Sequence, residues 1–199
     1  MKTLWTMVLL VLAGCSTTSD QGSPRITKET NGRITNLKVE GSLDKSHELP
    51  CIELSEAKNV YTPPDLYSSS AKCVLEGRDK DAAQIFFLAS AYGVYDGMRV
   101  NDPTAAQARQ VLIMNNLGSI DADRKAGLQK EMDKIGARQS PEIDQLCAGI
   151  IAIGKPDYHP QYMILHGMAA FSGIKGDGLK PGYDGGKNWA QVISSLKCP

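Results

Sequence analysis

The chain has 199 residues, of which 42% are hydrophobic and 22% are charged, and its 22 basic side chains are balanced by 22 acidic ones. This length and composition predict a single domain behind a short leader. Without a basic excess, there is no electrostatic reason to expect nucleic acid or an anionic surface as a partner.

The first 14 residues have the pattern of a secretory signal that ends at a lipidation site. Lys2 supplies a positive charge, residues 4–12 form an apolar run, and residues 12–15 read Leu-Ala-Gly-Cys. The run is too short to cross a bilayer as a helix. The pattern predicts that the thiol of Cys15 is acylated and that cleavage leaves Cys15 as the first mature residue. An ordinary signal peptide or a buried helix is the alternative.

The residues after Cys15 bear on the destination of the anchored protein. Lipoproteins kept at the inner membrane typically carry Asp just after the acylated cysteine, whereas this chain has Ser16 and Thr17. By this resemblance we expect an outer-membrane lipoprotein that faces the periplasm. Several acyl chains on one cysteine anchor a protein stably, since each buried methylene contributes about 0.8 kcal/mol. Beyond Cys15 no apolar run reaches about 18 residues, so we expect no membrane-spanning segment there.

Four cysteines follow Cys15, and an even number in an oxidising compartment predicts two disulfides with three possible connectivities. We favour Cys51–Cys73, which would pin an N-terminal segment onto the first helix. The second pair would then be Cys147–Cys198, which would staple the last helix across a flexible loop. A zinc site is the alternative, but the chain has no C-x-x-C pair and its spacings do not suit a zinc finger. We expect no metal and no cofactor.

Residues 15–46 are rich in Ser, Thr, Gly, Lys and Glu, a composition typical of a polar tether. One feature favours local order instead. Asn31-Gly32 lies between Ile26-Thr27 and Ile34-Thr35, and Asn-Gly flanked by β-branched residues is a hairpin signal. A small β-hairpin within the tether is therefore the alternative to a structureless segment.

From residue 62 onward the chain reads as all-α. Capping residues or prolines open each apolar-periodic segment, and glycine ends most of them. The signals predict helices at about 63–76, 79–92, 103–118, 121–136, 141–154, 160–173 and 188–196. We therefore expect one helical bundle over residues 47–199, preceded by the signal peptide (1–14) and the tether (15–46).

The helices predicted at 63–76 and 79–92 carry half of a tetratricopeptide-type pattern. Gly77, Ala82, Phe86 and Ala89 stand where such repeats place a turn glycine, a small residue, an aromatic and a second small residue. No second copy follows at a period near 34. The sequence favours a single degenerate helix pair within a bundle over a repeat array.

The sequence offers little catalytic chemistry. It contains no G-x-S-x-G elbow and no glycine loop for phosphate after a strand. His159 and His166 are seven residues apart on one predicted helix, and a structural role is favoured over metal binding because no carboxylate ladder surrounds them. We therefore expect a binding protein and no enzyme.

Two segments are candidates for partner contact. The glycine-rich stretch 174–187 lies between helices and is either a recognition loop or a mobile connector. Its candidate partner-binding residues are Lys175, Asp177, Lys180, Tyr183 and Asp184. Around the end of the second helix, Tyr95, Asp96 and Arg99 suggest a buried tyrosine–salt-bridge cluster that sets the angle between the helices predicted at 79–92 and 103–118, with direct partner contact as the alternative.

Part of the chain, over roughly residues 50–170, resembles a known group of proteins. The stretches that carry the likeness are Pro63 to Tyr67, Cys73, Asp81 to Ala83, Phe86 to Asp96, Arg99-Val100 and Thr104 to Ala108. They resemble the small helical lipoproteins encoded beside type VI secretion phospholipase effectors. Those lipoproteins are immunity proteins, which sit in the periplasm and bind an incoming lipase so that it cannot reach phospholipid.

This resemblance implies that the chain binds and inhibits a secreted phospholipase effector in the periplasm. The residues that carry it look structural, so it transfers no partner-contacting residue. An adaptor that scaffolds envelope or secretion-machine components is the alternative function. Both functions need protein–protein binding, a membrane contact through the lipid anchor only, and no nucleic acid.

Overall fold

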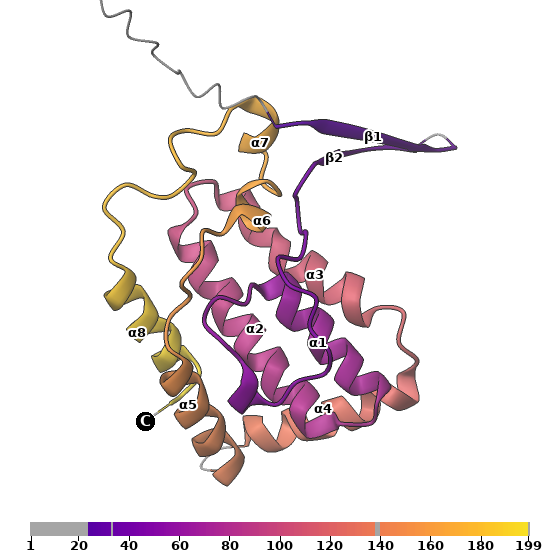
Figure 1. Ribbon diagram of the computed structural model, residues 1–199, viewed down its shortest axis with the longest axis vertical. Helices are drawn as coiled ribbons and strands as arrows, with labels where there is room; N and C mark the ends of the chain where they lie inside the picture. The colour runs from indigo at the N-terminus through magenta and orange to yellow at the C-terminus, as the bar shows by residue number, and fades with distance from the viewer. Residues whose placement is uncertain (1–23, 33, 138–139, 199) are drawn as a thin grey trace, which may run out of the picture.

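A computed structural model describes residues 24–32, 34–137 and 140–198, and it confirms the all-α class. Cys15 and the predicted signal peptide lie outside the described residues. Figure 1 shows the helices packed around α1 and α2, with a β-hairpin projecting from one end. The elements, with η for 3-10 helices, are β1 (Ile26–Asn31), β2 (Ile34–Val39), η1 (Leu54–Glu56), α1 (Pro63–Leu75), α2 (Asp79–Arg99), η2 (Pro103–Gln107), α3 (Ala108–Leu117), α4 (Ala122–Gly136), α5 (Pro141–Ile153), α6 (Gln161–Ile164), α7 (Ala169–Ser172) and α8 (Gly185–Ser195).

The centre of the bundle is the predicted α1–α2 helix pair. The backbone N–H of Thr62 donates to the carboxylate of Asp65 (2.8 Å), which fixes the start of α1. Gly77 adopts a φ of 75° in the tight turn between the helices, a conformation that glycine takes without strain. α2 is buried along most of its length, and the apolar side chains that it places at the centre are Ala82, Ala83, Ile85, Leu88, Ala89 and Tyr92.

α2 is longer than predicted. The sequence predicts an end near Tyr92, but the helix continues through Gly93 and Gly97 to Arg99. A Cβ on Gly93 would lie 3.2 Å from the side chain of Arg109, and one on Gly97 would lie 3.5 Å from Ala106. Gly93 therefore allows α3 to pack closely, while a Cβ on Gly97 would make only an ordinary contact, and tertiary packing outweighs the low helix propensity of both glycines.

The helix predicted over 160–173 is wrong, because the chain forms two short helices, α6 and α7, joined by a turn. Asp102 is the physical cause. Its carboxylate accepts a hydrogen bond from the backbone N–H of Ala169 (2.7 Å), and Thr104 Oγ1 accepts one from Met168 N–H (2.9 Å). The two side chains accept hydrogen bonds from backbone N–H groups that would otherwise bond within a continuous helix. A new helix, α7, therefore begins at Ala169.

Two other helix starts differ from expectation. The segment predicted as one helix over 103–118 begins as the 3-10 helix η2 and becomes α-helical at Ala108. The last helix begins at Gly185 and not at Asn188, because the Asp184 carboxylate caps it by accepting from Lys187 N–H (3.0 Å).

α4 has the narrow buried seam that its charged sequence predicts, since only Leu128 and Ile135 are fully buried on it. Among the described residues, no helix has both the length and the apolar character that a bilayer crossing needs.

The hairpin, which the sequence indicates only as the alternative to a structureless segment, forms within the residues expected to be a tether. β1 and β2 pair antiparallel, with Ile26 opposite Val39 and Asn31 opposite Ile34. The chain after β2 then joins the helical body. Val39 and Ser42 are buried, and Leu43 N–H donates to the carbonyl of Tyr162 (3.1 Å). Residues 39–46 are therefore attached to the domain.

Both favoured disulfides are present. Cys51 joins Cys73 with a Cα–Cα distance of 4.7 Å, and Cys147 joins Cys198 with one of 5.4 Å. The first fastens the segment before η1 onto α1, and the second ties the chain after α8 to α5. Both attachments are the ones expected from the sequence.

Candidate functional site

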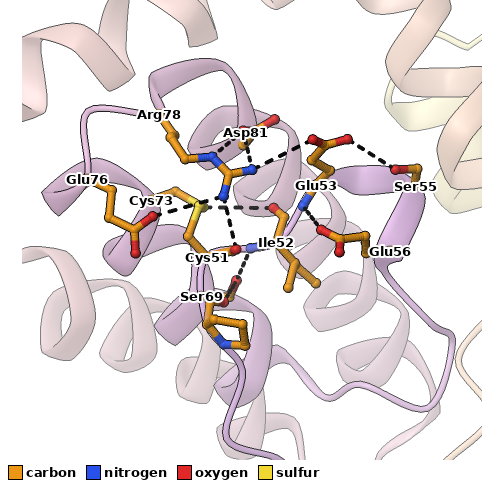
Figure 2. Close-up of polar contacts among 11 residues, drawn as sticks. Cys51, Ile52, Glu53, Ser55, Glu56, Ser69, Cys73, Glu76, Arg78 and Asp81 are labelled. Atoms are coloured by element: carbon orange, nitrogen blue, oxygen red, sulfur yellow. Dashed lines mark hydrogen bonds and ion pairs between the residues drawn. A yellow bond between two sulfur atoms is a disulfide. The ribbon is translucent and has the colours of Figure 1, made fainter.

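The segment that contains η1 is fixed against the α1–α2 corner by several bonds (Figure 2). Besides the Cys51–Cys73 disulfide, the hydroxyl of Ser69 in α1 donates to the carbonyl of Pro50 (2.6 Å) and accepts from Ile52 N–H (3.3 Å). The buried Ser69 hydroxyl thus supplies hydrogen bonds to a backbone carbonyl and a backbone N–H in a segment without regular secondary structure. Residues 50–52 are therefore held in place from two directions.

Arg78, at the start of α2, connects the same segment to the helices. It donates from Nε to Asp81 (2.8 Å) and from Nη1 to the carbonyl of Cys51 (3.2 Å). The carboxylates of Glu53 and Glu76 lie 4.0 Å from its guanidinium. Figure 2 shows the guanidinium at the centre of these groups. The position of η1 relative to α2 is thus set by a planar cation with several partners.

A polar cleft of about 700 Å³ opens beside this corner, between η1, α2 and α5. Gly149 of α5 permits the close approach of the two walls, since a Cβ there would lie 2.5 Å from Leu54. The other apolar residues that line it are Leu54, Ala57, Ala152 and Ile153. Its polar residues are Glu53, Ser55, Lys80, Asp81, Gln84 and Gln145. We call this space the Gln84 cleft.

Gln84 is the unusual residue of this cleft. Only 7% of the surface of Gln84 is exposed. Its side-chain amide makes no hydrogen bond within the part of the chain that the structure describes. The polar atoms of the Gln84 side chain are nevertheless in contact with solvent, because the amide faces the open space of the cleft. Buried amides in native proteins nearly always have partners, and an exception calls for an explanation.

The chemistry that this cleft offers is hydrogen bonding. Its one hydroxyl, on Ser55, lies 3.4 Å from Glu53 Oε2, and no histidine lines the space. Among the described residues, no cluster of three or more His, Cys, Asp or Glu side chains is arranged to hold a metal ion. The lining groups can bind and orient a polar ligand, and they do not form a nucleophile–base pair.

The sequence also contains Ser69-x-x-Lys72, a spacing used by serine–lysine acyl-transfer enzymes. In α1 both polar atoms are taken by backbone groups. Ser69 donates to Pro50 as described, and Lys72 Nζ donates to the carbonyl of Leu49. The two residues anchor the segment before η1.

The histidines do not gather at one place. The predicted helix that would align His159 and His166 is broken, so His159 precedes α6 and His166 lies in the turn after it. Burial lowers the pKa of His166, whose Nδ1 lies 3.3 Å from Ser42 Oγ. His47 Nδ1 lies 3.1 Å from the buried carboxylate of Asp65, which also accepts from the backbone N–H of His47 (2.9 Å). That carboxylate joins residue 47 to the start of α1.

The predicted tyrosine–salt-bridge cluster is present and buried. Asp96 Oδ1 accepts from Arg99 (2.7 and 2.9 Å), and Oδ2 accepts from the hydroxyls of Tyr158 (3.0 Å) and Tyr162 (2.8 Å). The guanidinium also lies over the ring of Tyr95, 5.0 Å from its centroid. Burial raises the pKa of Asp96, while Arg99 and the two hydroxyls favour the charged carboxylate. The cluster fastens α2 to residues 158–162, and not to α3 as expected.

The glycine-rich loop is fastened to the C-terminal end of α2. Lys180 donates from its backbone N–H to the carbonyl of Arg99 and from Nζ to that of Met98, both at 2.8 Å. Asn101 N–H donates to the carbonyl of Gly178 (2.9 Å). A lysine at a helix C-terminus also complements the helix dipole. The loop is therefore bonded to the helical body. It is neither a fully mobile connector nor a loop that projects away from the domain.

The five candidate residues of that loop have different surroundings. Lys175 and Asp177 are exposed. Tyr183 is half-buried and packs with Tyr95, whose pKa is raised to about 12 by burial and by the Tyr183 hydroxyl. Asp184 caps α8. Partner binding by these residues stays a prediction, while Asp177, which accepts from Leu179 N–H (3.0 Å), and Lys180, Tyr183 and Asp184 have structural contacts.

Comparison of the chain with protein-family models, with curated proteins and with solved structures finds no match.

Proposed function

We propose that the chain is a lipid-anchored periplasmic immunity protein, which binds a phospholipase effector of the type VI secretion system and inhibits it. The observation that carries this proposal is the use of cysteine. Cys15 ends an apolar leader run, and the other four cysteines are joined in two disulfides. Disulfides persist in oxidising compartments, and the periplasm is the compartment that a cleaved lipoprotein signal reaches in bacteria.

The partner class comes from the resemblance over residues 50–170, and the architecture suits the task. An inhibitor that acts by covering an enzyme needs a rigid, complementary surface and no catalytic group of its own. The helical body is cross-linked twice, and the lining of the Gln84 cleft supplies hydrogen-bonding groups. An interface of standard size buries about 1,600 Å² and can be tight when its surfaces are preorganised.

Inhibition is tested with a purified phospholipase effector of the type VI secretion system. We expect the purified protein, expressed with Cys15→Ala to keep it in solution, to abolish fatty-acid release from phosphatidylethanolamine vesicles at a ratio near one to one. The physical reason is that a covered active-site mouth excludes lipid. Unchanged hydrolysis at a large molar excess contradicts the proposal. Copurification with secretion-machine components in that case supports the adaptor alternative.

The anchor is tested by fractionation. Cys15→Ala is expected to move the protein from the outer-membrane pellet to the soluble periplasmic fraction, because no acyl chains remain to hold it. Labelling with radioactive palmitate should be lost in parallel, while circular dichroism of the soluble domain stays unchanged. Ser16→Ala is the matched control and should remain in the pellet. Membrane association that survives Cys15→Ala argues against lipidation at this position.

A further inference from the structure

We propose that the Gln84 cleft receives a short polypeptide segment of the phospholipase effector and that the Gln84 amide pairs with a backbone peptide group of this segment. The identity of the segment's source rests on the proposed function. The peptide chemistry of the cleft rests on its own residues, and each of these is on a fixed element.

The first argument is the unmatched amide. Only 7% of the Gln84 residue is exposed, and its side-chain amide has no hydrogen-bond partner among the described residues, so it can pair only with water or with a ligand in the cleft. α2 keeps this amide between the buried residues Ala83 and Ile85, where a methionine or leucine would fit the core pattern. An incoming ligand that supplies a donor and an acceptor would replace that water, and the amide is then paired with the ligand in the complex.

The second argument is the shape of the hydrogen-bonding group. A primary amide offers one carbonyl acceptor and two N–H donors in a plane. A peptide group offers the complementary N–H and carbonyl, as a strand does toward its neighbour. Gln84 can therefore pair with the backbone of an extended segment without requiring a particular side chain there.

The third argument is the charge and the volume of the cleft. The carboxylates of Glu53 and Asp81 at its rim are balanced by Lys80 and by Arg78, which pairs with Asp81 (2.8 Å), so the rim has no positive excess to hold phosphate or another strongly anionic headgroup. The volume of about 700 Å³ lies within the range of about 300–1,000 Å³ typical of ligand sites.

The fourth argument is preorganisation. The η1 wall is held by the Cys51–Cys73 disulfide and by Arg78, so little conformational entropy is lost there when a ligand binds. The cleft is also separate from the glycine-rich loop. Gln84 and Arg99 are fifteen positions apart on α2, which at 1.5 Å per residue places them about 22 Å apart along the helix.

The test compares inhibition of the phospholipase by the intact protein and by variants of the cleft. Gln84→Met keeps the length of the side chain and removes its hydrogen bonds, so we expect about a tenfold loss of affinity, corresponding to two neutral hydrogen bonds. Its thermal midpoint should be equal or higher, whereas a merely structural amide predicts a lower one. Ala152→Trp, at an exposed position of the lining, should fill the cleft and weaken binding as well. Gln110→Met, on the exposed surface of α3, is the matched control and should bind normally.

The outcomes separate the two proposals. Wild-type inhibition that survives both Gln84→Met and Ala152→Trp overturns the peptide cleft and leaves the immunity function standing. If only the Lys175→Ala/Asp177→Ala variant loses affinity, the contact belongs to the glycine-rich loop, and this result also overturns the peptide-cleft proposal. If the wild type does not inhibit, panning a random-peptide library decides the cleft by itself. Peptides that bind the wild type and not Ala152→Trp then support it, and the absence of such peptides overturns it.

Discussion

Asp96→Ala is expected to lower the free energy of unfolding by about 3–5 kcal/mol, the usual cost of removing one partner from a buried ion pair. Asp96 is fully buried, and the side chain of Arg99 is only 5% exposed. Without the carboxylate, the guanidinium stays buried with its hydrogen bonds to the carbonyl of Tyr158 and to Tyr183, and its charge has no counter-ion. Urea unfolding followed by circular dichroism measures the change.

Comparison variants separate the charge from the hydrogen bonds around Asp96. Tyr158→Phe and Tyr162→Phe each remove one donor and should cost about 1 kcal/mol. Asp96→Leu/Arg99→Met replaces both charges and should recover much of the loss, because no unpaired ion is left. A loss below about 1 kcal/mol for Asp96→Ala would mean that the cluster does not hold α2 to residues 158–162.

Removing the second disulfide with Cys147→Ala/Cys198→Ala is expected to lower stability by about 4 kcal/mol. The bridge closes a separation of 51 residues, and loop-closure entropy in the unfolded chain gives this magnitude. The native contacts of α8 remain, because the ring of Trp189 packs edge-on against two tyrosine rings. The distance between ring centroids is 5.7 Å to Tyr92 and 5.8 Å to Tyr95. The variant should therefore fold and unfold at a lower urea concentration.

The first disulfide provides the comparison. Cys51→Ala/Cys73→Ala opens a separation of 22 residues, for which the same reasoning gives about 3 kcal/mol. Its larger consequence is local, because this bridge positions the η1 wall of the Gln84 cleft. Equal stability of the 147/198 variant and the wild type under oxidising conditions would refute the entropic account.

Local signals were sufficient for much of the fold. Thr62 with the two prolines marks the start of α1, and Ser140-Pro141 marks the start of α5. Asn31-Gly32 gives the hairpin, and the cysteine positions give both bridges. These features succeed because capping, turn and cross-link chemistry act over a few residues or through a single bond.

The errors arose where distant residues decide the local structure. Gly93 reads as a stop in isolation, and it is a contact with Arg109 in the folded chain. Residues 160–173 read as one helix until Asp102 takes the amide of Ala169. Neither of these two long-range contacts can be read from the sequence of the segment that it changes.

The candidate site was harder to predict than the fold. Gln84 looks like an ordinary polar residue of an amphipathic helix, and its significance depends on η1 and α5 closing around it. One signal was available, since Gln84 lies between apolar neighbours on a helix that is apolar on most sides.

The Cys147–Cys198 bridge has a consequence for proteolysis. The exposed residues of the glycine-rich loop, such as Lys175 and Lys180, lie between the two linked cysteines. A protease that cuts the backbone there leaves two fragments still joined by the bridge, with α8 tied to α5. Only a cut followed by reduction separates the pieces, so a nicked molecule keeps its C-terminal helix.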